Sequence, residues 1–144
     1  GTPIGAIVMV RDDHCAVEKL FNAFEKGDTD VVPDICDALE RHAMIEEEVF
    51  YPAVRSDVEE ADDTVLESVE EHHVVKTLIA ELRGMSGDEE NYAAKATVLM
   101  ENVRHHIEEE EGEMFPQVRS ALGRKRLQEL ADQMQRVQGA QAPA

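Results

Sequence analysis

Apolar residues recur every three or four positions in four long stretches of the chain, the spacing that places them on one face of an α-helix. The four stripes contain Ile7, Val10, His14, Val17, Phe21 and Phe24; Ile35, Leu39, His42, Glu46, Val49 and Ala53; Val65, Val69, His72, Val75, Ile79 and Leu82; and Leu99, Val103, His106, Glu110 and Met114. No stretch shows the period of two that is typical of a strand. The pattern therefore predicts an all-α fold with four long helices.

The ends of these helices can be placed from Pro and Gly. Thr2 and Pro3 suit the N-cap and the first position of a helix that we expect to end at about residue 26. Pro52 should kink or end the second helix, because proline lacks the backbone N–H that a helix needs.

A fifth, shorter amphipathic segment follows Gly123. Its apolar positions are Leu127, Leu130, Met134 and Val137. We therefore expect a four-helix bundle over residues 1–122, and a C-terminal helix with a disordered Gly, Ala and Pro tail over residues 123–144.

Each of the four long stripes carries one histidine, and these are His14, His42, His72 and His106. If successive helices run antiparallel with their histidines level, the turns should fall midway, near residues 28, 57 and 89. Asp28, Asp57 and Asp88 lie there, each in a turn-like stretch. This agreement predicts an up-down-up-down bundle with all four histidines at one level of its core.

The second half of the chain repeats the first. Residues 42–52 read HAMIEEEVFYP and residues 106–116 read HIEEEEGEMFP, so each segment carries HxxxE. Residues four apart lie one helical turn apart, about 6 Å along the axis, so both side chains can reach one metal ion. The predicted metal ligands are His14, His42, Glu46, His72, His106 and Glu110. Such imidazoles and carboxylates suit iron, with manganese or zinc as alternatives.

Other polar residues near these motifs have less specific interpretations. Glu108, Glu109 and Glu111 are expected on a solvated helix face. His105 and Glu109 form a rival HxxxE, but their stripe is polar, so we expect His105, and likewise His73, to point outward.

Three larger side chains near the predicted ligands leave two interpretations open. Tyr51 and Phe115 are expected in the core or at its rim, although Tyr51 could reach the site as a ligand or redox partner. Lys76 lies one turn beyond His72, where it could cover apolar surface with its stem or orient an anionic ligand.

The chain of 144 residues has a net charge of −18, with 32 acidic and 14 basic residues. Such a surface would repel nucleic acid and anionic membranes, so neither is an expected partner. The two cysteines, Cys15 and Cys36, are predicted to lie too far apart for a disulfide. Unpaired thiols, the short apolar runs and the lack of a signal-peptide pattern favour a soluble, cytoplasmic protein.

The order of the histidines, with both HxxxE motifs and the tails EE-x-x-FYP and EE-x-x-MFP that begin at Glu46 and Glu110, resembles the hemerythrin-like HHE cation-binding family over about residues 5–120. The resemblance implies a cofactor of two iron ions with an oxo or hydroxo bridge. Hemerythrin itself has a second histidine four residues after its third-helix ligand, where this chain has Lys76, and HxxxxD in place of HxxxE. These departures favour the bacterial variants implicated in handling peroxide, nitric oxide or oxygen.

Counting coordination positions gives the functional expectation. Two six-coordinate irons have about 12 positions, and four histidines, two bridging carboxylates and a bridging oxygen fill about ten of them. Two exchangeable positions suit reduction or disproportionation of hydrogen peroxide, and possible reaction with nitric oxide. We therefore expect a catalase- or peroxidase-like protein whose partner is a small oxidant or diatomic gas. The alternative is a module that binds or senses dioxygen, nitric oxide or iron without turnover.

Overall fold

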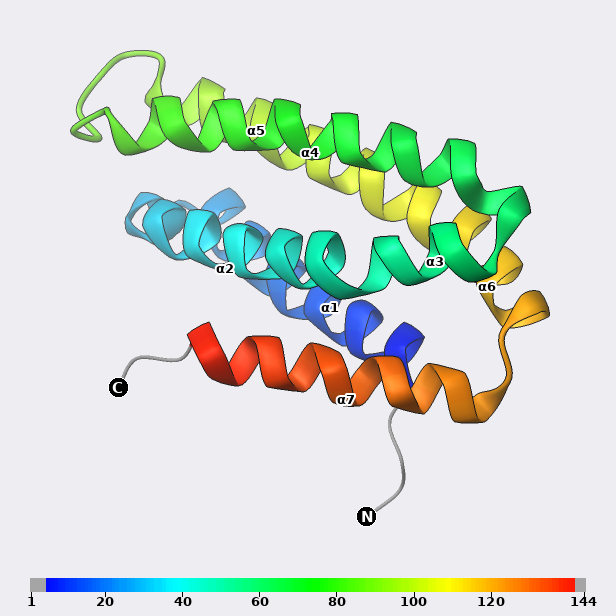
Figure 1. The fold of residues 1–144 in the computed structure, drawn as a ribbon. Coiled ribbons are helices and arrows are strands. Elements are labelled where there is room, and N and C mark those ends of the chain that lie inside the picture. The colour runs from blue at the N-terminus through cyan, green and yellow to red at the C-terminus, as the bar shows by residue number, and fades with distance from the viewer. Residues whose placement is uncertain (1–4, 142–144) are drawn as a thin grey trace.

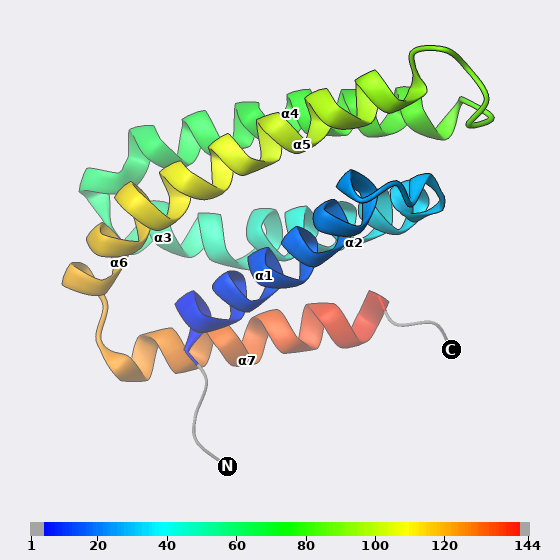
Figure 2. The ribbon, with the colours of Figure 1, turned by 180° about the vertical axis from the view of Figure 1, so that it is seen from behind.

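Helices make up nearly all of the part of the chain that the computed structural model describes, residues 5–141 (Figures 1 and 2). The elements are α1 (Ala6–Glu25), η1 (Thr29–Val31), α2 (Val32–Ile45), η2 (Glu46–Phe50), α3 (Tyr51–Asp57), η3 (Glu59–Ala61), α4 (Asp62–Arg83), α5 (Tyr92–Glu109), η4 (Glu110–Met114), α6 (Phe115–Ala121) and α7 (Arg124–Gln141). The predicted all-α fold is confirmed.

Two helical hairpins form the body of the molecule. One pairs α1 with α2 and its continuation α3, and the other pairs α4 with α5 and its continuation α6 (Figure 1). Successive long helices run in opposite directions, as the up-down-up-down prediction requires. Figure 2 shows the fifth helix, α7, lying along the outside of α1, and α7 also packs against α2 and η2.

The connections fall close to the residues that the histidine midpoints predicted. The first follows Gly27, whose φ of 111° is a left-handed conformation that glycine adopts without strain, and the third contains Gly87 at a φ of 103°. In the first turn the Asp28 side chain accepts a hydrogen bond from the backbone N–H of Asp30. These turns keep the four histidine-bearing helices antiparallel and level.

Of the two effects expected of Pro52, a kink or an end of the second helix, the end does not occur. The chain instead passes from α2 through one π-helical turn, η2, into α3, with Pro52 in the first turn of α3. The second repeat does the same at η4 and Pro116. A wider turn makes room for the proline ring, and the N–H that proline lacks is not needed in the first turn of the next segment. The two π-turns contain Glu46 and Glu110.

The two ends of the chain differ in part from expectation. The predicted cap and first helical position, Thr2 and Pro3, lie outside the described residues, and α1 begins at Ala6 after Gly5. Helix α7 continues to Gln141, so Gly139 belongs to the helix and not to the expected tail, and residues 142–144 lie outside the described part. The division between residues 1–122 and 123–144 stays a prediction.

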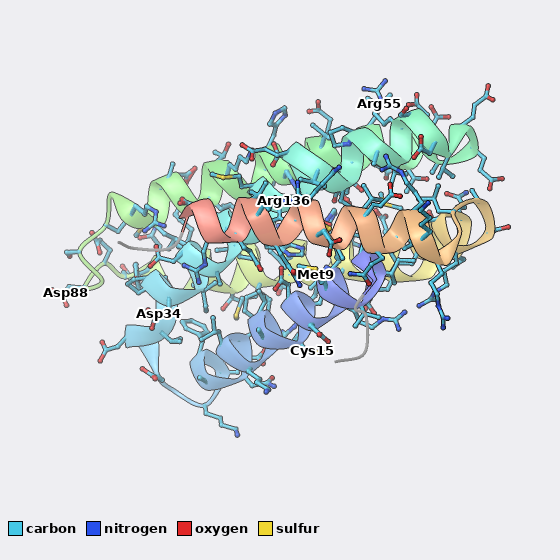
Figure 3. All side chains as sticks on the ribbon, turned by 60° about the horizontal axis from the view of Figure 1, so that its bottom comes forward. Met9, Cys15, Asp34, Arg55, Asp88 and Arg136 are labelled. Atoms are coloured by element: carbon cyan, nitrogen blue, oxygen red, sulfur yellow. The ribbon has the colours of Figure 1, made fainter. Side chains whose placement is uncertain are left out.

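Two apolar clusters fill the bundle on either side of the histidine level. The cluster toward α3, α6 and α7 includes Phe50, Phe115 and Leu130, and the cluster toward the open ends of the two hairpins includes Phe21 and Ile79. Charged side chains such as Asp34, Arg55 and Asp88 project from the outer surfaces in Figure 3. The ligand level is thus enclosed above and below by apolar side chains.

Candidate metal centre

The six predicted ligands converge between the two apolar clusters. Each comes from a different element, and every side chain is buried: His14 (α1), His42 (α2), Glu46 (η2), His72 (α4), His106 (α5) and Glu110 (η4). Both glutamates have no exposed surface at all. Buried carboxylates are rare unless a positive charge compensates them, so a cation bound in this layer would stabilise it.

One group of four donors surrounds a single point. His14, His42, Glu46 and Glu110 each offer an atom within 4.8 Å of the others. The Nε2 atom of His14 lies 3.1 Å from Oε1 of Glu110, and Nε2 of His42 lies 3.1 Å from Oε1 of Glu46. Donor atoms that are co-ligands of one metal have such separations, because each lies about 2.0–2.2 Å from the ion.

A second group lies beside the first and shares Glu46 with it. Glu46, His72 and His106 also offer atoms within 4.8 Å of one another, and Nε2 of His72 lies 3.2 Å from Oε1 of Glu46. The second oxygen of Glu110 lies 3.2 Å from Nε2 of His106. Each glutamate therefore contacts a histidine of both groups, which is the placement of a bridging carboxylate.

The donor atoms of the first group have no hydrogen-bond partner. These atoms are Nε2 of His14 and of His42, both carboxylate oxygens of Glu46, and Oε1 of Glu110. Neighbouring donors are close, but they are not aligned for hydrogen bonds. An unpartnered buried polar group costs about 1–3 kcal/mol, and a charged one costs more. The residues present therefore fit a bound metal ion, which would satisfy these atoms together.

Four carboxylates outside the layer orient the histidines. Each one contacts the Nδ1 atom of a histidine in the predicted ligand set: Glu111 on His14 at 2.6 Å, Asp13 on His42 at 3.0 Å, Glu47 on His72 at 2.9 Å and Glu71 on His106 at 2.7 Å. A hydrogen bond at Nδ1 fixes the ring so that Nε2 faces the metal position and makes it a better donor.

These outer carboxylates were missed by the sequence analysis. Glu111 was expected on a solvated face, but its carboxylate reaches across to α1 and contacts His14, so that expectation was wrong. The internal repeat could have indicated these carboxylates, because they recur at equivalent positions in its two halves. Asp13 and Glu71 each precede a predicted ligand histidine by one residue, and Glu47 and Glu111 each follow a predicted ligand glutamate by one. Each of the four long helices, counted with its π-turn, carries one histidine of the predicted set and one carboxylate that contacts the histidine of another helix.

Charges within the layer stabilise each other. Burial by itself lowers the pKa of His42, but the charge of Glu46 and the hydrogen bond to Asp13 raise it to about 10. Burial opposes a charge on His106 too, yet the nearby carboxylates of Glu110, Glu46 and Glu71 raise its pKa to about 12. Burial would raise the pKa of Glu46, and the charge of His42 with the close imidazoles of His106 and His72 instead holds it well below its usual range. A metal ion binding here competes with protons.

Tyr51 reaches the site, which decides between its two interpretations. Its hydroxyl donates a 2.6 Å hydrogen bond to Oε2 of Glu110 and lies 3.1 Å from Nε2 of His106 and 3.4 Å from Nε2 of His72. Phe115, its counterpart in the repeat, stacks on His14 with centroids 6.2 Å apart. The two repeats therefore differ beside their histidines: one group has a hydroxyl and the other has only a phenyl ring.

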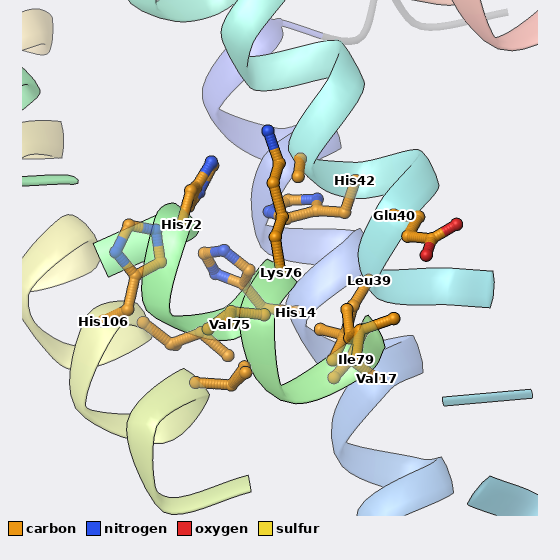
Figure 4. A pocket seen from close by; sticks show the side chains of 13 residues that line it. His14, Val17, Leu39, Glu40, His42, His72, Val75, Lys76, Ile79 and His106 are labelled. Carbon is orange, nitrogen blue, oxygen red and sulfur yellow. The ribbon is translucent and has the colours of Figure 1, made fainter. Parts of the chain in front are cut away.

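An apolar cavity adjoins the histidines (Figure 4). All four histidines of the predicted ligand set line it, whereas Glu46 and Glu110 do not. Lys76 stands at its edge, with its ammonium 2.7 Å from Glu47.

His73 and His105, the members of the two histidine pairs that are not predicted ligands, face outward as predicted. The His105 side chain is 65% exposed and lies 2.9 Å from Glu109, so the rival HxxxE is a surface pair. The His73 side chain is 62% exposed and contacts Glu70. Neither histidine belongs to the buried layer.

The fold and the buried layer define a metal-binding helical bundle built from two repeated hairpins. The chain belongs to the Hemerythrin HHE cation binding domain family, whose pattern matches residues 5–118. A similar solved structure is the crystal structure of a Hemerythrin HHE cation binding domain-containing protein from Mycobacterium kansasii. It superposes with a TM-score of 0.79 at 20% identity, covering 95% of this chain and 89% of that one. The suggested resemblance and the bundle fold are confirmed.

A curated relative is named DNA nickase and comes from Nostoc sp. (strain PCC 7120 / SAG 25.82 / UTEX 2576). It is 27% identical over 128 residues, which make up 85% of this chain but 36% of that protein. The chain therefore spans about a third of this relative's length. The expectation that nucleic acid is not a partner stays a prediction.

Among the described residues, no helix is both long and apolar enough to cross a membrane.

Proposed function

We propose that this layer binds two iron ions, with His14 and His42 on one, His72 and His106 on the other, and Glu46 and Glu110 bridging them. The observation that carries the proposal is the set of unpartnered buried donors around one point, beside a second group that shares Glu46. Membership of a cation-binding family supports the metal. Mixed imidazole and carboxylate donors, without cysteine, support iron over softer metals.

Iron at this position would supply redox chemistry toward small oxidants. We propose that the chain reacts with hydrogen peroxide, in a catalase- or peroxidase-like manner, and that nitric oxide is a further ligand. Disproportionation converts two molecules of hydrogen peroxide into two of water and one of dioxygen, so it needs no other reductant. The coordination count supports this reaction, because six protein ligands and a bridging oxygen would leave about two of the roughly 12 positions on two irons open for exchange.

The protein's own groups have distinct parts in this proposal. The four outer carboxylates hold the imidazoles in place, so the donor atoms need little rearrangement during the reaction. The Tyr51 hydroxyl, 2.6 Å from Oε2 of Glu110, can hold a proton at that oxygen or pass it on. The apolar side chains around the layer exclude bulk water.

The test measures dioxygen release from hydrogen peroxide by iron-loaded protein, with His42→Ala as the inactive comparison and His73→Ala as the matched control. His73 is exposed and lies next to a proposed ligand, so its removal should leave both iron content and turnover unchanged. Iron-loaded protein that binds dioxygen or nitric oxide reversibly but does not consume peroxide would contradict turnover and favour the binding or sensing alternative.

A further inference from the structure

A third group of metal-ligating side chains lies outside the buried layer, on the surface between α4 and α5. Glu71, His105 and Glu109 each offer a donor atom within 4.8 Å of the others, and we call them the surface group. The Nε2 atom of His105 lies 2.9 Å from Oε1 of Glu109 and 4.0 Å from Oε2 of Glu71. The surface group is built like the buried centre, because an HxxxE motif on one helix is joined by a carboxylate from a neighbouring helix.

The two carboxylates of the surface group have no basic side chain to balance their charge. Among the described residues, neither Glu71 nor Glu109 forms an ion pair with a lysine or an arginine, and their ion-pair contacts are histidines. By contrast, the orienting carboxylate of Glu47 lies 2.7 Å from the ammonium of Lys76. The side chains of Glu71 and Glu109 are only 22% and 26% exposed, so water screens their repulsion incompletely. A bound cation would stabilise this pair.

The internal repeat shows that orienting a histidine does not require the whole surface group. The first half has other residues at the positions equivalent to Glu71, His105 and Glu109, and these are Asp13, Arg41 and Ile45. Asp13 contacts Nδ1 of its histidine at 3.0 Å, much as Glu71 does at 2.7 Å. An arginine repels a cation and an isoleucine has no donor atom, yet the orienting contact is present in both halves. His105 and Glu109 therefore add two metal donors that this contact does not need.

Glu71 joins the surface group to the buried layer. Its Oε1 atom lies 2.7 Å from Nδ1 of His106, and its Oε2 atom lies 4.0 Å from Nε2 of His105. The surface group is thus separated by one carboxylate from a histidine that we assign to the buried metal pair. The His105 side chain is 65% exposed, so a cation held here would be next to the layer and still in contact with water.

We propose that Glu71, His105 and Glu109 form a surface site for a divalent cation, and that this site captures Fe²⁺ on its way to the buried layer. One imidazole and two carboxylates suit Fe²⁺, Mn²⁺ and Zn²⁺, with water at the remaining coordination positions. Because the site is open to water, its cation exchanges readily, and the site changes the rate at which iron enters and not the final iron content. The capture role rests on the proposed function, whereas the site itself depends only on these three residues.

Manganese tests the surface site by itself, because the unpaired electrons of Mn²⁺ broaden the NMR signals of nearby imidazoles. His73 in the same full chain is the internal comparison, since its side chain is 62% exposed but contacts a single carboxylate, that of Glu70. The ring signals of His105 should broaden at about tenfold lower Mn²⁺ than those of His73, because the charge of the ligands sets the affinity of carboxylate sites. Equal sensitivity of the two rings would overturn the site.

Two charge-matched variants locate the bound manganese. Glu109→Gln should remove the difference between His105 and His73. Glu108→Gln removes the same charge from an exposed position of α5 and should keep that difference. A difference that persists in Glu109→Gln would place the manganese in the buried layer and would also overturn the site.

Iron uptake tests the capture role. The metal-free full chain is mixed with Fe²⁺, and protein-bound iron is measured at successive times after rapid gel filtration. Glu109→Gln should take up iron about tenfold more slowly than wild type and reach the same final content, since local charge changes association rates by about 10- to 1,000-fold. Glu108→Gln should load like wild type. Equal uptake rates for Glu109→Gln and wild type would overturn the capture role, whereas manganese binding at the surface site of a chain that takes up no iron would contradict the proposed function alone.

Discussion

Replacing Glu110 with Ala removes the carboxylate that contacts a histidine of both donor groups. Its two oxygens lie 3.1 Å from Nε2 of His14 and 3.2 Å from Nε2 of His106, and the side chain has no exposed surface. We expect Glu110→Ala to lose at least one metal ion per chain, because no other carboxylate replaces this bridge and water is a weaker ligand for a buried ion.

The expected stability change follows from binding linkage. A metal present at 100 times its Kd stabilises the folded chain by about 2.7 kcal/mol. For a domain of this size, each kcal/mol shifts Tm by about 2–4 °C, so losing one metal should lower Tm by about 5–10 °C. Adding a chelator should lower the Tm of wild type by at least this amount and that of Glu110→Ala by clearly less, since the variant has less metal to lose.

Glu109→Ala is the matched control, one residue away on the same helix. Its carboxylate contacts only the exposed His105 among the histidines, at 2.9 Å. The variant should keep the metal content of wild type and a Tm within about 2 °C of it, as surface substitutions usually do. The two variants are compared by their metal content, measured by plasma mass spectrometry, and by their calorimetric Tm with and without chelator. Equal behaviour of the two variants would refute the assignment of the bridging carboxylate.

Three further predictions test other parts of the site. Lys76→His should place a second imidazole one turn from His72, where it can fill one open coordination position. Peroxide turnover should then fall, and dioxygen bound by the reduced protein should have a longer lifetime. Equal rates of oxygen release from hydrogen peroxide by variant and wild type at matched iron loading would refute the coordination count. Glu111→Ala should weaken metal binding about 10- to 100-fold, because the His14 ring loses the carboxylate that orients it. The control Glu108→Ala should leave the metal affinity unchanged. Competition with a chromophoric chelator measures both affinities. The pKa of His42 is raised from 6.5 to about 10, so its protonation stabilises the metal-free fold fully below pH 6.5, and this stability is lost as pH rises toward 10. Metal binding near pH 7 should therefore release protons, which calorimetry in buffers of different ionisation enthalpy detects, and heat independent of the buffer would contradict the raised pKa.

The ligand layer could be predicted because its geometry follows from periodicity. His42 and Glu46 share a helical face at a spacing of four, and antiparallel helices with turns at the midpoints bring His14 and His106 to the same level. These relations depend on the backbone alone, so the sequence indicates them directly. The assignment of these residues as ligands still awaits measurement of a bound metal.

The features that the sequence did not predict depend on contacts between helices. Glu111 contacts His14 because of how two neighbouring helices are rotated, and a charge run seen along one helix does not reveal this. The hydroxyl of Tyr51 faces the site because the π-turn η2 shifts the register of the residues that follow it. Pro52 was expected to kink or end the helix, but a π-turn accommodates the proline ring while the helix continues.

The metal content of the purified chain tests the central claim most directly. Protein from iron-supplemented cells should carry about two irons per chain, with an oxo-to-iron charge-transfer band in the near ultraviolet that changes when hydrogen peroxide is added. The six proposed ligands and their unpartnered donor atoms predict this result. Stoichiometric zinc under the same iron-replete growth, or no metal at all, would contradict it.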